Sequence, residues 1–588
     1  MHTPEKETPL SLRIAGFAFV SIAAMFLSAC GGGGGGGNDD GDGGDGGRNP
    51  PPAPANACSD RSDCVSVNGS ALYEFVPAVS GAGGTRLAYE LSELRPIRGA
   101  EVVLMNAASN TVLDSTVTDA NGVFALAAPP ETEVVVRVRA LLSRAGRPGW
   151  EVRVVDNTRN QGVWSAQGEA FTTGSESVSI ELVASSGWDG AGYAGSRAAA
   201  PFAMLDSAWL AMQRVLEADA DAVFPPLKIN WSPENRSCNG SSYPFADGCI
   251  TTSHFGRYGS EGRNIFVLGR ENDDTDEFDR HVIIHEWGHY YEDAFARSDS
   301  IGGAHTLGDH LDPRVAFGEG WGNAWSGIAT DDPVYVDTSG SRQGRGFSFN
   351  VEADSAWNPG WWSEASVQRI LFDLYDGAND DGMALGFAPL HAALTEAQRQ
   401  TMALTTIFPL IHFLKQRQPA AASAIDELVL ANGIAVISDE WGSGRTALDN
   451  TASRNTEAFV VPVYAELVAG TPLELCTTDA YAREVGEYIE SNRLGARRFA
   501  RFTPPSSGSW QVRLQTSAAG GDPDFHVRLR GRTVAAGMDD SAGSGVETLN
   551  VNLEGGQTYV IEVMDYINVD DSAASGGNVC LELGVERN

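Results

Sequence analysis

Two histidines, His285 and His289, stand four residues apart, and Glu286 directly follows the first of them. On a helix this spacing places both imidazoles on one face, about one turn apart, so that two nitrogens can approach one metal ion. Glu286 is then placed to reach a metal-bound water rather than the metal itself. The alternative is a pair of core or surface histidines at helical spacing. With only 10 histidines in the chain, the pattern favours a metal site.

A catalytic zinc needs a third protein ligand and one open position. Phe295 stands where the elongated metzincin motif has its third histidine, so that motif is excluded. Glu319 is the predicted third ligand, because it lies among glycines that let a second helix pack closely against the first. The His, His, Glu pattern resembles the gluzincin clan, which includes thermolysin-like peptidases. This resemblance implies an α+β zincin-like catalytic domain, Zn²⁺ as cofactor and hydrolysis of peptide bonds.

Related enzymes often carry a carboxylate about one turn after the third ligand, where it orients a zinc-bound histidine. Asn323 occupies that position here. An amide oxygen can also accept a hydrogen bond from an imidazole N–H, so we expect the orienting contact to survive. Asp309 or Asp312 is the alternative source of charge behind the ligands.

The predicted mechanism needs a general base and a group that stabilises the tetrahedral oxyanion. Glu286 is the predicted base. The candidates for the second role are His305, His310, Tyr290 and Tyr375. The two histidines lie in a glycine-rich loop between the two metal motifs. A structural role is an equally good interpretation for each candidate.

The elements around these residues are predicted to mix helices and strands over 187–470, which we assign to the metallopeptidase domain. Ser363 is a predicted helix cap, and Thr395 with Gln398 resembles a capping box at the start of the next helix. The strand at 264–268 is either the sheet edge that pairs with an extended peptide or an ordinary core strand.

Residues 58–186 are predicted to form an all-β sandwich. The runs 97–104 and 133–138 are rich in β-branched residues, and Asn121–Gly122 is typical of a tight hairpin. The pattern is similar to carboxypeptidase regulatory-like domains, which implies a structural or interaction module.

A second β-sandwich is predicted over 471–588, where the segments 509–514, 525–529 and 558–563 alternate apolar and polar residues. The pattern resembles the bacterial pre-peptidase C-terminal domain. That resemblance implies a module that accompanies secreted proteases and is either removed on maturation or helps to bind substrate.

The first 29 residues are predicted to be a signal peptide, because Lys6 and Arg13 precede an apolar run that ends before Cys30. The tetrapeptide Leu27–Cys30 resembles a bacterial lipobox, which implies cleavage before Cys30 and lipid attachment to its sulfur. Gly31 after this cysteine favours the outer membrane or cell surface. Residues 30–57 form a Gly/Asp/Pro-rich linker. A plain secretory signal with a chance cysteine is the alternative.

Six further cysteines suit an exported chain with three disulfides. Pairing within each domain is the simplest choice, although six cysteines allow 15 pairings. A structural zinc cluster is the alternative. The predicted pairs are Cys58 with Cys64, Cys238 with Cys249 and Cys476 with Cys580.

The 588-residue chain carries 77 acidic and 41 basic residues, a net charge of −36. This balance argues against nucleic acid as a partner. It is typical of solubility in a salty medium, or of Ca²⁺ binding by acidic loops such as Glu271–Asp274 or the pair Asp522 and Asp524.

The predicted partners are a protein or peptide substrate and, through the lipid anchor, a membrane. The predicted activity is that of an endopeptidase. The alternatives are an aminopeptidase and a non-catalytic surface lipoprotein, either an adhesin or a glycan or protein binder. A binding protein has no need for a carboxylate beside the first histidine, whereas a hydrolase does.

Overall fold

The computed structural model describes most of the chain from Cys58 onward. The described ranges are 58, 63–238, 241–352, 356, 358–377, 383–444, 459–482, 484–485, 488–489, 491–516, 518, 520–537, 545–569 and 577–588. The predicted signal peptide (1–29), Cys30 and the linker (30–57) therefore lie outside the described residues. Among the helices of the described part, none combines the length and the apolar composition that crossing a bilayer requires.

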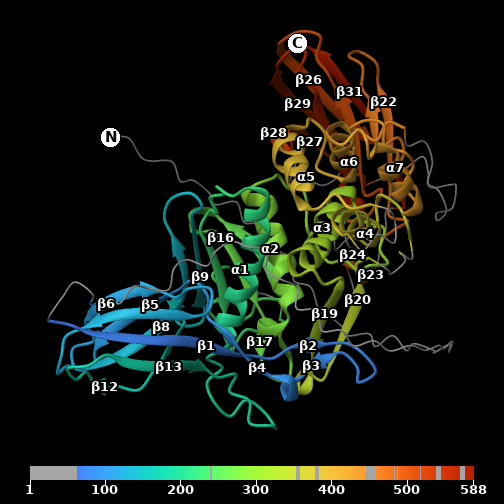
Figure 1. The fold of residues 1–588 in the computed structure, drawn as a ribbon. Helices are drawn as coiled ribbons and strands as arrows, with labels where there is room; N and C mark the ends of the chain where they lie inside the picture. Colours follow the sequence, from blue (N-terminus) through green and yellow to red (C-terminus); the bar gives the residue numbers. More distant parts are fainter. Residues whose placement is uncertain are drawn as a thin grey trace, which may run out of the picture.

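The first part of the described chain is built from strands in two sheets (Figure 1). The smaller sheet contains β1 (Val65–Phe75), β4 (Glu93–Pro96), β7 (Val123–Ala128) and β13 (Val178–Ala184). The larger sheet contains β5 (Ala100–Asn106), β6 (Val112–Val117), β8 (Glu133–Arg144) and β9 (Trp150–Asp156), with the short strands β10 (Gly162–Val163), β11 (Ser165–Gln167) and β12 (Phe171–Thr172). Apolar side chains from both sheets, such as Val67 and Val136, share one core. This arrangement is consistent with a β-sandwich.

The predicted turn at Asn121–Gly122 forms, with a φ of +76° at Gly122. Asp119 supports it by accepting hydrogen bonds from the backbone N–H groups of Asn121 and Val123, each 2.8 Å long. The turn does not close a hairpin, because β6 pairs with β5 in the larger sheet whereas β7 pairs with β1 in the smaller one. The hairpin prediction is therefore wrong, and the turn carries the chain from one sheet to the other.

The larger sheet continues past the boundary predicted between 186 and 187. Strand β14 (Leu227–Trp231) pairs in parallel with β9, β16 (Gly262–Val267) pairs in parallel with β14, and β15 (His254–Tyr258) is the outer strand, antiparallel to β16. One sheet thus joins residues on both sides of that boundary. The strand predicted at 264–268 corresponds to β16, which has a neighbour on each side and is an interior strand. The sheet edge at this end belongs to β15.

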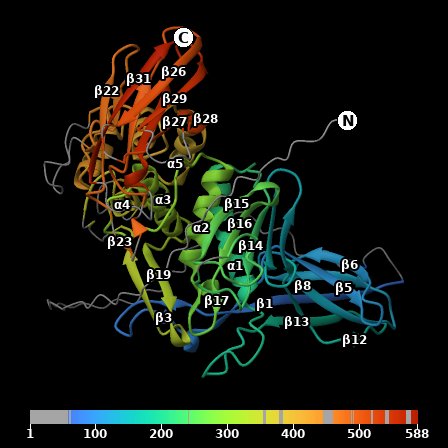
Figure 2. The same ribbon diagram turned by 180° about the vertical axis from the view of Figure 1, so that it is seen from behind.

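Helices pack beside this extended sheet, with α1 and α2 against its strands and α3 against α2 (Figures 1 and 2). Their bounds are α1 (Ala200–Ala218), α2 (Arg280–Ala294), α3 (Pro313–Thr330), α4 (Glu364–Tyr375), α5 (Phe387–Ala392), α6 (Ile407–Arg417) and α7 (Ala422–Ala431). Glycines let α2 and α3 cross closely, because a Cβ on Gly288 would lie 3.2 Å from the Cα of Gly322. Trp321 Nε1 donates a 3.0 Å hydrogen bond to Gly288 O across the same crossing.

A small antiparallel sheet lies beside the start of α2. It contains β17 (Gly269–Arg270), β18 (Asp274–Thr275), β19 (Val334–Ser339) and β20 (Arg345–Asn350). Asp279 immediately precedes α2 and accepts a 2.7 Å hydrogen bond from the backbone N–H of Thr338 in β19. The start of α2 is therefore tied to this sheet.

The C-terminal module consists of two further sheets around a separate apolar core. One sheet contains β21 (Tyr464–Glu466), β25 (Arg497–Phe502), β27 (Pro523–Leu529), β28 (Arg532–Gly537) and β30 (Tyr559–Asp565); the other contains β22 (Leu473–Thr478), β26 (Gly508–Thr516), β29 (Val546–Leu553) and β31 (Asn578–Arg587). The predicted strands at 509–514, 525–529 and 558–563 fall within β26, β27 and β30, apart from the first residue of the last. A short hairpin, β23 (Glu484–Val485) and β24 (Tyr488–Ile489), leaves this module between β22 and β25.

Three disulfides join Cys58 to Cys64, Cys238 to Cys249 and Cys476 to Cys580. The predicted pairing is confirmed, and the alternative of a structural zinc cluster at these cysteines is excluded.

One predicted helix cap forms and the other does not. The Ser363 side chain accepts a 3.3 Å hydrogen bond from Ser366 N at the start of α4. The capping box at Thr395 is wrong, because Thr395 donates to His391 O instead. Thr406 caps the following helix, α6.

Candidate metal centre

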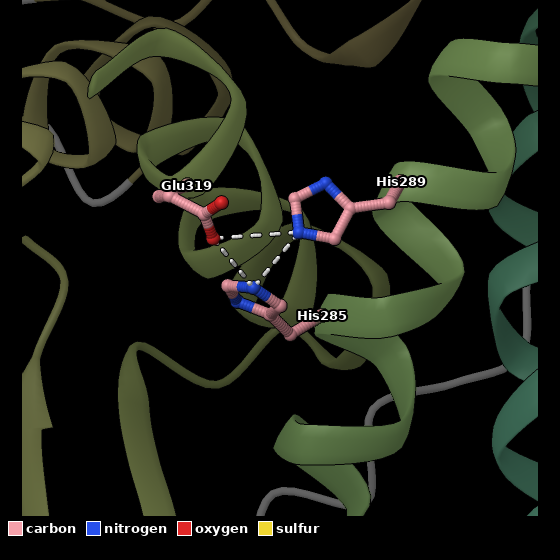
Figure 3. A group of neighbouring side chains, drawn as sticks. All are labelled: His285, His289 and Glu319. Carbon is pink, nitrogen blue, oxygen red and sulfur yellow. Dashed lines mark hydrogen bonds and ion pairs between the residues drawn. The ribbon is translucent and has the colours of Figure 1, made fainter. Parts of the chain in front are cut away.

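Helices α2 and α3 bring His285, His289 and Glu319 to one point (Figure 3). These three residues are called the triad below. The Nε2 atoms of the two histidines are 3.2 Å apart. Glu319 Oε2 lies 3.3 Å from His285 Nε2 and 3.4 Å from His289 Nε2. The structure thus brings together the three residues that the sequence analysis predicts as metal ligands.

These separations match those of ligands around a tetrahedral zinc ion. At zinc–ligand distances of about 2.0–2.1 Å, two ligands at the tetrahedral angle lie about 3.3–3.4 Å apart. Within the described residues this group has three members, so a tetrahedral ion held by them would keep one position for a water or a substrate. Two imidazoles and one carboxylate with one open position are a donor set typical of catalytic zinc.

The outer nitrogens of both histidines face acceptors. His285 Nδ1 lies 2.9 Å from Asn323 Oδ1, and His289 Nδ1 lies 3.5 Å from a carboxylate oxygen of Glu292. These acceptors favour the tautomers with the ring proton on Nδ1, which leave a lone pair on each Nε2. The predicted contact from Asn323 forms, whereas Asp309 and Asp312 pair with arginines, Arg493 and Arg314 respectively.

Three lone-pair acceptors thus face one another, and such atoms repel unless positive charge lies between them. Burial lowers the pKa of His289, but the carboxylates of Glu319 and Glu292 outweigh it and raise that pKa well above its usual value. Burial raises the pKa of Glu319, but His305 and His289 hold it well below its usual range. A cation between these atoms, either a proton or a metal ion, would remove this repulsion.

Gly322 on α3 lies directly against the His285 ring. A Cβ at this position would come within 2.7 Å of His285 Cε1 and 2.9 Å of Nε2. Any side chain here would displace the imidazole that faces Glu319. The glycines around the third predicted ligand therefore serve both the helix crossing and the placement of this ring.

Glu286 lies beside the triad at the edge of the large sheet. Its Oε2 accepts a 2.7 Å hydrogen bond from the backbone N–H of Phe255 in β15. Its negative charge also contributes to the raised pKa of His289. The carboxylate is therefore held by the outer strand and acts electrostatically on His289.

Of the candidates for the second electrophile, His305 is the one that reaches the triad. Its Nε2 lies 3.1 Å from Glu319 Oε2, and its Nδ1 lies 2.6 Å from Glu364 Oε2 at the start of α4. Burial lowers the pKa of His305, but Glu319 and Glu364 raise it well above its usual value. His305 is thus held between two carboxylates, one of which is the predicted third ligand.

The structure does not bring the other candidates to the triad. His310 stacks on Trp362 with ring centroids 5.9 Å apart. Tyr290 donates a 2.7 Å hydrogen bond to Pro225 O. Tyr375 donates to Asp331, which directly follows the last residue of α3 and lies 12 residues beyond Glu319, or about 18 Å at 1.5 Å per residue.

Two carboxylates near the triad are not anticipated by the sequence analysis. Glu292 lies three residues after His289, so the helical repeat places it on the same face, and this spacing could have identified it. Glu364 lies 59 residues after its partner His305. No local pattern connects those two positions.

A second acidic cluster lies near the start of α2. Asp274, Asp276 and Asp337 place carboxylate oxygens within 4.8 Å of one another. Burial, followed by the neighbouring carboxylates, raises the pKa of Asp274 to about 8 and raises those of Asp276 and Asp337 well above their usual values. This cluster includes the last residue of the acidic loop Glu271–Asp274, for which Ca²⁺ binding stays a prediction.

Comparison with known proteins relates the region around the triad to peptidases. Residues 218–404 match the family model of the Mycolysin C-terminal domain. The match covers less than half of the chain but includes α2, α3 and α4, and with them the triad, Glu286 and His305. This segment is therefore peptidase-related. No curated protein matches the sequence.

Solved structures resemble parts of the chain only distantly. The pre-peptidase C-terminal domain of a collagenase from Bacillus anthracis is 13% identical, covers 21% of this chain and 93% of that one, and has a TM-score of 0.14. CorA, a surface-associated copper-binding protein of Methylomicrobium album, is 10% identical, covers 21% and 98%, and has a TM-score of 0.16. At these identities and TM-scores the likenesses carry no argument.

The contact between Asn323 and His285 leads to a first prediction. Replacing Asn323 by Ala is expected to weaken zinc binding about 10–100-fold, because His285 loses the acceptor that fixes its ring. Competition with a chromophoric chelator measures the affinity. Ser326→Ala, on the same helix and also buried, is the matched control and should bind zinc like the wild type. Equal affinities for Asn323→Ala and the wild type would contradict the orienting role.

Proposed function

We propose that this chain is a zinc-dependent peptidase of the gluzincin type, with an α+β zincin-like catalytic domain flanked by β-sandwich modules. The observation that carries the proposal is the convergence of two imidazole Nε2 atoms and one carboxylate oxygen at 3.2–3.4 Å, with both Nδ1 atoms facing other acceptors. The match to a peptidase-associated family over the same residues supports it.

The residues divide the chemistry between them. His285, His289 and Glu319 would hold the ion, which would supply a Lewis acid that polarises the scissile carbonyl and makes a water molecule more acidic. Glu286 accepts the proton of the attacking water and passes it to the leaving amine. His305, fixed through Nδ1 by its carboxylate partner, directs Nε2 toward the site and donates a hydrogen bond to the developing oxyanion.

The substrate is proposed to be an extended peptide. In β15, Phe255 directs its N–H away from β16 toward Glu286, and the two-residue repeat of a strand gives Arg257 the same orientation. A peptide that pairs with this edge would therefore run past the Glu286 carboxylate. A peptide bound along its length suits an endopeptidase, which needs no free N-terminus.

The place of action is proposed to be the bacterial cell surface or outer membrane. The lipobox-like segment before Cys30 and the linker up to residue 57 support anchoring through lipid on that cysteine. The three disulfides are typical of a compartment outside the cytoplasm.

The direct test uses the purified full chain with a peptide library and casein as substrates. We expect about one zinc per chain, hydrolysis of an N-terminally blocked peptide, loss of both on treatment with 1,10-phenanthroline, and recovery on adding Zn²⁺. Cleavage restricted to the peptide with a free N-terminus would indicate an aminopeptidase instead. A zinc-loaded chain that cleaves neither peptide would contradict the proposed function.

A further inference from the structure

The loop that carries His305 has little structure of its own. Residues 301–310 contain no helix or strand, and Gly302 and Gly303 adopt φ values of +65° and +103°. Within the loop, Asp309 N donates to Thr306 O, and Asp309 accepts from Thr306 N. These bonds close one turn after His305 but leave the segment before it without internal support. Contacts from elsewhere must therefore fix where His305 lies.

Glu364 and Asn358 supply some of those contacts, to His305 Nδ1 and to Gly308 O, and the C-terminal module supplies others. Asn492 Nδ2 donates to Gly302 O and to Ala304 O, each at 3.0 Å. Arg493 Nη1 donates to the same Ala304 O at 2.9 Å, and its Nη2 lies 3.1 Å from Asp309 Oδ2. Both side chains are almost fully buried. They bracket the loop on each side of His305.

The segment around Asn492 and the loop around His305 approach each other closely, and backbone hydrogen bonds also join them. A Cβ on Gly303 would lie 2.7 Å from Asn492 Nδ2, so glycine is required where the two segments touch. Leu494 N donates to His310 O, and Asp312 N donates to Asn492 O, both at 2.9 Å. The segment 492–494 thus runs alongside the loop and the residues that lead into α3.

The C-terminal module is also fixed to α3, the helix that carries Glu319. Arg314, in the first turn of α3, is fully buried and pairs with Glu562 of β30 at 2.9 Å. Arg497 and Arg528 of the module pair with the same carboxylate, at 3.2 and 2.6 Å. The module is therefore docked against the helices of the metal centre.

We propose that Asn492 and Arg493 are positioning residues for His305, so that the C-terminal module completes the active site. This inference rests on the proposed peptidase function, because it assigns His305 a part in the reaction. Asn492 and Arg493 hold the carbonyl groups of Gly302 and Ala304 before His305, Arg493 also pairs with Asp309 after it, and Glu364 holds its Nδ1. Loss of these two side chains would therefore release the loop that carries His305.

The test compares two buried asparagines of the module in the zinc-loaded full chain. Asn492→Ala removes both bonds to the loop. Asn568→Ala is the matched control, because Asn568 is equally buried but donates to Thr477 Oγ1 inside the module, at 2.9 Å. We expect Asn492→Ala to lower kcat at least tenfold with KM within about twofold, since a displacement of about 1 Å can cost a hundredfold in rate. Asn568→Ala should keep kcat near the wild-type value.

A double variant shows whether the effect passes through His305. His305→Ala is expected to lower kcat about 10²–10³-fold, as the loss of an oxyanion donor does. Adding Asn492→Ala to His305→Ala should lower kcat no further, because the residue being positioned is gone. Multiplying effects would overturn the proposal, as would equal losses for Asn492→Ala and Asn568→Ala.

Hydrogen–deuterium exchange provides a readout that needs no activity. The amides of residues 302–309 should exchange faster in Asn492→Ala than in the wild type or Asn568→Ala, with zinc content unchanged. Arg493→Lys, which keeps a positive charge near Asp309, should give a smaller change in the same direction. Unchanged exchange in both loop-contact variants would overturn the positioning role. If the wild type cleaves no peptide while the loop responds as expected, the proposed function fails and the contact stands.

Discussion

Replacing Glu286 by Gln is expected to lower kcat for peptide hydrolysis about 10²–10⁴-fold, the range that a positioned general base contributes. The amide has nearly the same shape, and its oxygen can still accept the hydrogen bond from Phe255 N–H. The fold and the placement of the side chain should therefore survive. An amide cannot accept the proton of the attacking water, so the chemical step alone is impaired.

The measurement is kcat on a blocked peptide, with zinc content determined in parallel. Glu286→Gln should keep about one zinc per chain, because Glu286 is not one of the three converging residues. Glu396→Gln, an exposed position paired with Arg417, is the control for the substitution itself and should keep the wild-type rate. Hydrolysis at the full rate by Glu286→Gln would show that this carboxylate is not the base.

Local spacing was sufficient to predict the centre of the site. The four-residue interval of His285 and His289 needs only a helix to bring both rings to one face, and α2 provides it. Glu319 could be anticipated because the glycines around it permit a close helix crossing, and the approach of Gly322 to Gly288 shows that crossing. The disulfides were predictable for the same reason, since each joins cysteines of one module.

Contacts between distant segments were not predictable in this way. His305 and His310 share one loop, and only the tertiary position of Glu364 and Asn492 decides which of them faces the triad. Tyr375 is the last residue of α4. Its hydroxyl therefore reaches Asp331 at the C-terminal end of α3 and not the triad. A one-dimensional pattern defines the face of a helix on which a residue lies but not its neighbour on another element.

The sheet to which each strand belongs could not be predicted from the sequence for a similar reason. The Asn121–Gly122 turn has the local geometry of a hairpin turn, yet its two strands pair with different partners. Strand β14 lies beyond the predicted boundary at 186, and its apolar residues suit any buried strand, so nothing local assigns it to β9. Strand pairing depends on which edges remain open once the whole chain has folded.

One contribution to the free energy of unfolding of the zinc-loaded chain, dialysed free of calcium, is expected to fall as pH rises from about 4 to about 8. The cause is the acidic cluster of Asp274, Asp276 and Asp337. Unfolded aspartates lose their protons near pH 3.9, whereas burial and the mutual repulsion of the carboxylates raise the pKa of Asp274 to about 8 in the folded chain. The folded state therefore retains protons that the unfolded state releases across this window, so a higher pH favours unfolding.

Differential scanning calorimetry between pH 5 and pH 8.5 measures this contribution as the difference in melting temperature between Asp337→Asn and the wild type. The melting temperature of Asp337→Asn should rise relative to the wild type as pH rises, because the variant removes one of the repelling charges, whereas the exposed control Asp221→Asn should show no such trend. A difference between Asp337→Asn and the wild type that is the same at every pH in calcium-free buffer would contradict the retained protons. If the cluster binds Ca²⁺, adding the ion should raise the melting temperature most at high pH, since the ion replaces protons that are then already lost. The same shift in Asp337→Asn as in the wild type would rule out this cluster as the calcium site.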